Sequence, residues 1–155
     1  MFNINKLKTG LDDALLHLNG DREIPGITNS MAFVSGPGSW FPWHLEEMNL
    51  GSINYMHVPN RAVPEFSDVP KGEKVWNFVA KYHLHAFESV MDNLLKASGY
   101  EVECSNYIMH RFLGLNPSIL NAFGIDTFWY RQQEGQSIVT FPNCYHSGKV
   151  DNDKQ

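Results

Sequence analysis

Short strands that do not alternate regularly with helices are the feature that most constrains the fold of this 155-residue chain. Period-two patterning predicts a strand over 52–58, and three more strands are predicted, at 31–35, 127–132 and about 137–141. Helical spacing of apolar residues predicts helices over 4–18 and 72–97, and Asn116-Pro117 predicts a short helix that ends at Gly124. This order favours a mainly β fold with helical additions, a sandwich or barrel, over a doubly wound α/β sheet.

The composition is that of one globular domain, which we expect to span 1–155. Hydrophobic residues make up 43% of the chain, and the formal net charge of −5 argues against direct nucleic-acid binding while suiting a basic peptide partner. The two cysteines, Cys104 and Cys144, are too few for a disulfide framework, so a reducing compartment is expected. No apolar run reaches the length of a membrane span, and no secretory leader is predicted.

A histidine and a glutamate two positions apart, His44 and Glu46, form the main candidate site. In an extended segment both side chains point the same way, so they can face one point in space. Two histidines and one carboxylate form a facial triad that holds iron and leaves three coordination positions open. His146, which follows the strand-like "IVTF", is the candidate third ligand. The alternative is a loop histidine beside a solvated glutamate.

The segments around this pair resemble a known family. "FPWHLEEMNLGSINYMHV", with "ITNSMAFVSG" before it and "IVTFPNCYHSG" after it, resembles the JmjC domain, and in particular the zinc-bearing demethylases of trimethyl-lysine that pair JmjN with JmjC. The resemblance spans nearly the whole chain, with an apparent insertion of about fourteen residues between Asn60 and Glu103. It implies a double-stranded β-helix, of the cupin-like JmjC type, that holds Fe(II) and 2-oxoglutarate.

The resemblance also implies roles for individual residues. The iron ligands that it implies are His44, Glu46 and His146. For 2-oxoglutarate it implies an aromatic wall, Phe41, and a hydrogen-bond donor, Asn54. The methyl-lysine pocket that it implies includes Gly26 and Phe33. Read from the residues alone, phenylalanines such as these two belong more often to a packed core than to a pocket. Cys104 and His110 have the spacing of two zinc ligands of that family, and we predict that they lie within about 4 Å of each other.

The family pattern is not matched everywhere. The relatives hold the far carboxylate of 2-oxoglutarate with a lysine eight positions after the asparagine, and here that position is Ala62, with Arg61 beside it as the candidate replacement. A tyrosine upstream and a final strand downstream in the family also have no counterpart in this sequence. We therefore expect a truncated or diverged JmjC domain, incomplete at both ends.

The function implied by the resemblance is that of an Fe(II)/2-oxoglutarate-dependent dioxygenase, which removes methyl groups from histone lysines in the nucleus. The missing lysine favours a second hypothesis, a catalytically silent JmjC-like module that binds a protein partner or a histone tail. A third is a β-helix metalloenzyme acting on a small molecule. From the sequence we expect metal binding without appreciable turnover.

Overall fold

The computed structural model describes residues 10–69, 71–101 and 103–151, which divide into two compact units that meet in the sequence at Ser35 and Gly36. The first unit contains α1 (Gly10–Leu18), and the start of the predicted helix 4–18 lies outside the described residues. The strand predicted at 31–35 is wrong. Phe33 and Val34 are exposed and no described strand pairs with them, so burial does not favour an extended ladder there. A single domain over 1–155 stays a prediction.

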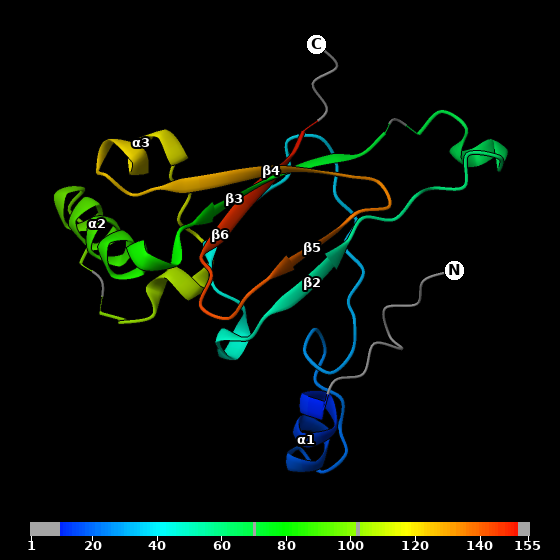
Figure 1. Cartoon of the computed structure of the whole chain (residues 1–155), viewed down its shortest axis with the longest axis horizontal. Helices are drawn as coiled ribbons and strands as arrows, with labels where there is room; N and C mark the ends of the chain where they lie inside the picture. The colour runs from blue at the N-terminus through cyan, green and yellow to red at the C-terminus, as the bar shows by residue number, and fades with distance from the viewer. Residues whose placement is uncertain (1–9, 70, 102, 152–155) are drawn as a thin grey trace. The chain divides into compact units, whose positions relative to one another are not determined.

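The second unit is built on two antiparallel sheets (Figure 1). The larger sheet has the order β1-β6-β3-β4, and the smaller pairs β2 with β5. The strands are β1 (Trp40–His44), β2 (Ser52–Tyr55), β3 (Glu73–Val79), β4 (Thr127–Gln133), β5 (Ser137–Thr140) and β6 (His146–Asp151). The helices are α2 (Leu84–Ala97) and α3 (Pro117–Ala122), with short 3₁₀ turns η2 (Glu47–Asn49), η3 (Pro64–Phe66), η4 (Lys81–His83) and η5 (Tyr107–His110). The predicted mainly β class with helical additions is confirmed.

The predicted helix 72–97 is wrong over its first third, where the chain forms β3. Val75 and Val79 are four apart, a spacing that suits a helix, but "EKVWNFV" is also rich in the β-branched and aromatic residues that favour strands. Pairing decides the outcome, because β3 is hydrogen-bonded to β4 on one side and to β6 on the other. The strand predicted over 52–58 ends at Tyr55, whereas α3 begins as predicted, with the Asn116 side chain accepting a bond from the Ser118 amide.

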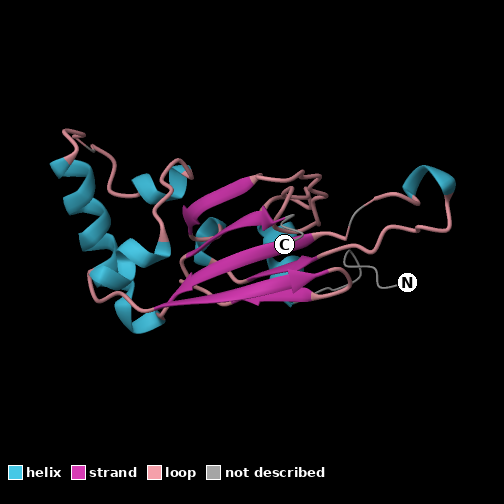
Figure 2. Cartoon of the chain, turned by 90° about the horizontal axis from the view of Figure 1, so that it is seen from above, coloured by secondary structure: helices cyan, strands magenta, loops and turns pink. Residues whose placement is uncertain are grey.

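The hydrophobic core of this unit lies where α2, α3 and η5 meet the ends of the strands. Figures 1 and 2 show α2 and α3 at one end of the two sheets, and the loop that carries η3 at the opposite end. The buried cluster consists of Trp43, Leu45, Val79, Phe87, Met91, Tyr107, Ile108, Leu120, Ile125 and Tyr145. Among the helices that the structure describes, none has the length and apolar character needed to cross a bilayer.

Alternation along and just beyond β1 separates the core from the candidate site. Trp43 and Leu45 enter the buried cluster, and the Trp43 indole donates a 2.8 Å bond to the Leu115 carbonyl. His44 and Glu46 therefore point to the other face. The H-x-E spacing is thus fixed by the burial of the two apolar neighbours.

Candidate metal centre

The two histidines of the site are cross-strand neighbours. His44 ends β1 and His146 begins β6, and the two residues are paired in the antiparallel register. Their ring centroids lie 4.3 Å apart, and both residues are buried. The 102-residue separation in sequence is closed by strand pairing, which is why the sheet determines the site.

Each imidazole is oriented by a backbone carbonyl. His44 Nδ1 lies 2.8 Å from the Pro42 carbonyl oxygen, and His146 Nδ1 lies 2.9 Å from that of Cys144. A carbonyl only accepts, so both Nδ1 atoms carry the proton; the Nε2 lone pair of His44 is free, and Nε2 of His146 is directed at the Glu46 carboxylate. Burial, reinforced by the neighbouring His146, lowers the pKa of His44 to about 4. His44 is therefore a neutral imidazole, the form that binds metal.

Glu46 supplies the carboxylate. One ligand atom from each of His44, Glu46 and His146 can be chosen so that all lie within 4.8 Å of one another. Oε1 of Glu46 is 3.3 Å from His146 Nε2, and the Arg111 guanidinium is 3.8 Å from Oε2. The hydrogen bond from His146, aided by one from Ser52, lowers the pKa of Glu46 to about 2. The carboxylate is anionic at neutral pH.

A serine and a threonine from the smaller sheet hold this carboxylate in place. Ser52 Oγ lies 2.6 Å from Glu46 Oε1 and 2.7 Å from Thr140 Oγ1. An ionised carboxylate only accepts, so Ser52 donates to Glu46 and Thr140 donates to Ser52. The Ser52 amide in turn donates to Thr140 Oγ1 at 3.0 Å. The register of β2 and β5, in which these residues are opposite, therefore positions a carboxylate next to the other sheet.

The donor set fits a divalent transition metal. Two imidazoles and one carboxylate, all converging from one side, match the facial triad of non-heme iron and leave coordination positions open. Metal ligands normally have hydrogen-bond partners of their own, and here these are the backbone carbonyls beyond the two imidazoles and the Ser52 hydroxyl beyond Glu46. Among the described residues, this is the only group of three or more potential ligands that converge.

Lys74 is a site residue that the sequence reasoning missed. It lies on β3 with its ammonium 4.4 Å from the Phe41 ring centroid and 4.1 Å from that of Trp76. Burial lowers its pKa from 10.5 to about 8, against the raising effect of the Glu46 charge. A half-buried cation thus faces the metal centre. Ala62, the position given by counting from Asn54, lies in the loop between β2 and β3, whereas Lys74 lies on β3 itself.

Phe41 and Asn54 both lie on the side of the triad. The Phe41 ring centroid is 5.9 Å from that of His44 and 6.3 Å from that of His146. Phe41 fits there because its β6 partner is Gly148, where an added Cβ would lie 2.4 Å from the phenylalanine ring. Asn54 is two positions from Ser52 on β2, so the two side chains share a face.

Arg61 is engaged elsewhere. Its guanidinium forms a bidentate pair with Glu134 at 2.6 and 2.9 Å, and its Nε donates to the Val69 carbonyl. Glu134 also accepts a 2.9 Å bond from the Gly72 amide. Arg61 is therefore part of a clamp on the loop between β2 and β3. A contact between Arg61 and 2-oxoglutarate stays a prediction, and the pairing with Glu134 disfavours it.

The remaining predicted residues lie away from the triad or in the first unit. Cys104 Sγ and His110 Nε2 lie 3.4 Å apart, as predicted, and both residues are exposed. A structural zinc takes four ligands, and a zinc role for these two residues stays a prediction. Gly26, with φ of +81°, and the exposed Phe33 belong to the first unit, and their part in a methyl-lysine pocket stays a prediction.

Known proteins are similar to this chain in sequence. Residues 31–151 match the JmjC domain family, described as a hydroxylase. Lysine-specific demethylase REF6 of Arabidopsis thaliana is 34% identical over 131 residues, covering 81% of this chain and 8% of that protein. Probable lysine-specific demethylase 4F of Homo sapiens is 30% identical over 148 residues, covering 95% of this chain and 20% of that protein.

The chain spans a fifth or less of the length of these two relatives. The family match nevertheless covers most of the chain, and it includes β1, β6 and all three residues of the triad. The chain belongs to the JmjC-domain family, among relatives that are lysine-specific demethylases.

Proposed function

We propose that this chain carries the metal centre of an Fe(II)/2-oxoglutarate-dependent demethylase that acts on methylated lysine of histone tails in the nucleus. The observation that carries the proposal is the convergence of His44, Glu46 and His146, with both Nδ1 atoms on backbone carbonyls so that Nε2 is the atom each imidazole offers to a metal. The names of the relatives support lysine demethylation as the reaction.

When bound, Fe(II) would support hydroxylation of an N-methyl group by O2, with 2-oxoglutarate oxidised to succinate and CO2; the hydroxymethyl product then releases formaldehyde. The protein residues hold this chemistry in place. The two imidazoles bind through Nε2 while their Nδ1 protons stay on backbone carbonyls. Glu46 stays ionised at neutral pH, and Ser52 fixes its orientation. Trp76 and Phe78, whose ring centroids lie 5.8 and 6.3 Å from that of His146, exclude water from this side.

We assign the far carboxylate of 2-oxoglutarate to Lys74. An ammonium on the aromatic faces of Phe41 and Trp76, in a half-buried setting, is a strong partner for an anion. Asn54 donates to the same cofactor from β2, and Phe41 forms its wall. Lys74 takes this role in place of both Ala62 and Arg61. The missing lysine was the main reason to expect a catalytically silent module, so we propose instead that the enzyme turns over.

Two further assignments belong to the same proposal. Gly26 and Phe33 contribute to the methyl-lysine pocket, in keeping with the family resemblance. Cys104 and His110 provide half of a zinc site, since they already lie at the separation of ligands that share one ion. We also propose that residues 1–155 form one domain.

The test is release of formaldehyde and succinate from a trimethyl-lysine histone peptide with Fe(II), ascorbate and 2-oxoglutarate. We expect turnover by the wild type and none by His146→Ala, with His57→Ala, an exposed histidine, as the matched control. Succinate release that persists in His146→Ala would contradict the metal centre. A protein that binds metal without releasing either product would restore the silent module.

A further inference from the structure

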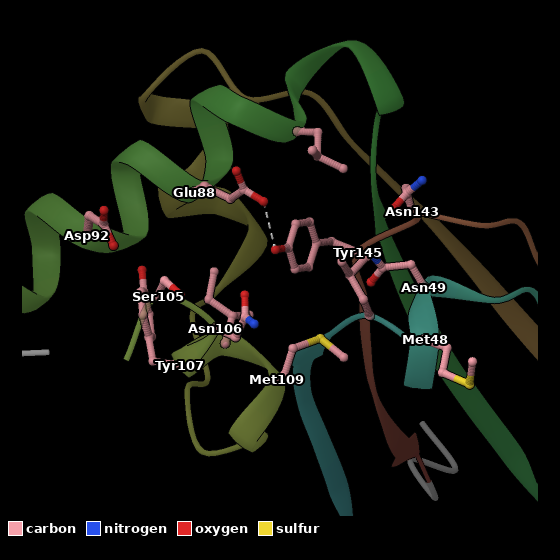
Figure 3. Close-up of a pocket in the computed structure, with 13 residues that line it drawn as sticks. Met48, Asn49, Glu88, Asp92, Ser105, Asn106, Tyr107, Met109, Asn143 and Tyr145 are labelled. Carbon is pink, nitrogen blue, oxygen red and sulfur yellow. Dashed lines mark hydrogen bonds between the residues drawn. The ribbon is translucent and has the colours of Figure 1, made fainter. Parts of the chain in front are cut away.

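A second cavity lies apart from the metal centre. It has a volume of about 690 Å³ and is bounded by α2, by the segment 105–109 that includes η5, and by Leu45 and Tyr145 (Figure 3). None of the three triad residues lines it. Leu45 points away from its neighbours His44 and Glu46, so the cavity and the metal centre are on opposite faces of this segment.

The wall of this cavity carries negative charge only. Glu88 and Asp92 lie one turn apart on α2, and Figure 3 shows both carboxylates on the side that faces Tyr145 and the 105–109 segment. The lining includes no lysine, arginine or histidine. An anionic ligand is therefore excluded, and a cation is favoured.

Two buried tyrosine hydroxyls also contribute polar groups to the wall. The Tyr145 hydroxyl donates a 2.9 Å bond to Glu88 Oε1. The Tyr107 hydroxyl is fully buried, and it forms no hydrogen bond with any described residue. Tyr107 as a whole is only 6% exposed, so its orphaned hydroxyl is costly unless a ligand satisfies it. Burial, then the proximity of Asp92, raises the pKa of Tyr107, so the hydroxyl keeps its proton at neutral pH.

We propose that this cavity binds an alkylammonium group, at the end of a lysine side chain or of a free polyamine. An ammonium has three N–H donors, and the cavity offers three kinds of acceptor in Glu88, Asp92 and the Tyr107 oxygen. The methylene stem packs against the apolar lining, which includes Leu45, Ile108 and Met109. The proposal stands independently of the iron chemistry.

A divalent metal is a weaker match for the same cavity. Calcium takes six to eight oxygen ligands, usually with several carboxylates among them. The acidic residues here are two, and although three asparagines and Ser105 also line the cavity, seven of its thirteen lining residues are apolar or aromatic. Glu88 and Asp92 are also absent from the groups of described residues that converge as metal ligands. The charge and the apolar stem together point to an organic cation.

The experiment is calorimetric titration of the full chain with two probes, spermidine and the blocked peptide acetyl-Gly-Lys-Gly-amide. A peptide with norleucine in place of lysine is the uncharged control. We expect Asp92→Asn to weaken the alkylammonium probe by about tenfold or more, the usual effect of losing a charged hydrogen-bond partner. Asp68→Asn, an exposed acid in a distant loop, removes the same charge and is expected to change affinity by less than twofold.

Tyr107→Phe keeps the ring in the core and removes only the hydroxyl, so it tests the site without unfolding the protein. Because the hydroxyl is unsatisfied in the free protein, we expect a Tm no lower than that of the wild type, together with weaker probe binding. The tighter of the two probes identifies the source of the ammonium group. The proposal is overturned if neither probe binds, if norleucine binds as well as lysine, or if Asp68→Asn weakens binding as much as Asp92→Asn. Calcium that binds in a manner abolished by Asp92→Asn would overturn it in favour of a metal site.

Discussion

Replacing Lys74 with methionine tests the cofactor site most directly. Methionine preserves most of the stem length, so contact with Phe41 and Trp76 is kept while the charge is lost. The 2-oxoglutarate carboxylate would then be desolvated against two aromatic rings without a counter-ion. Losing one partner of a buried charge pair costs about 2–5 kcal/mol. Because Lys74 is only half-buried, we expect the lower part of that range.

A cost of about 2–3 kcal/mol corresponds to weakening of roughly 30- to 150-fold. The assay is titration of 2-oxoglutarate into protein loaded with Mn(II), which avoids turnover. Lys81→Met, a change at an exposed lysine, is the control and is expected to bind normally. Wild-type affinity in Lys74→Met, or an equal loss in Lys81→Met, would refute the assignment.

The pH dependence of the same titration gives an independent check. The pKa of Lys74 is lowered to about 8, so the ammonium is charged below that pH and binds the cofactor at full strength. Above pH 8 the free protein must take up a proton to bind, and affinity is expected to fall by about tenfold per pH unit. In Lys74→Met this alkaline fall should vanish; a fall that persists would assign it to another group.

The other predictions concern the ligands, their support and the inserted loop. His44→Ala and His146→Ala are expected to lose the bound metal in elemental analysis, and equal metal content in wild type and both variants would sink the triad. Ser52→Ala is expected to weaken metal binding by about 10- to 100-fold, the usual effect of removing an outer contact, whereas Ser67→Ala, in an exposed turn, should leave it unchanged. Glu134→Gln is expected to speed tryptic cleavage after Arg61, because the clamp on the loop is weakened; an unchanged cleavage rate would show that the clamp does not restrain the loop.

Local patterns predicted much of the site. The H-x-E spacing placed His44 and Glu46 on one face because alternation is a property of the extended backbone itself. The Asn116 cap and the closeness of Cys104 and His110 also depend on residues within one short segment. Such features depend only on residues that are close in sequence, so they can be predicted without knowing how the strands pair.

The features that the sequence reasoning missed depend on strand pairing. Ser52 and Thr140 are 88 residues apart and meet only because β2 and β5 adopt one register. Gln132, fully buried, accepts from the Trp76 indole and donates to the Asn54 carbonyl, so it links the two sheets through contacts that no local pattern encodes. The segment 73–79 has apolar spacing compatible with a helix, and its two partner strands decide against it.

The loop between β2 and β3 is clamped at both ends, and this clamp bears on how the position of Lys74 is set. Glu134 holds Arg61 near the start of the loop and the Gly72 amide at its end, so the two ends of the loop are tied to one side chain. A surface loop closed in this way adds length at modest entropic cost. The chain then enters β3 in the register set by β4 and β6, and Lys74 faces Phe41 whatever the length of the loop. The place of the Lys74 ammonium is therefore set by the register of β3 with its two partner strands, and it does not depend on the number of residues between Asn54 and Lys74.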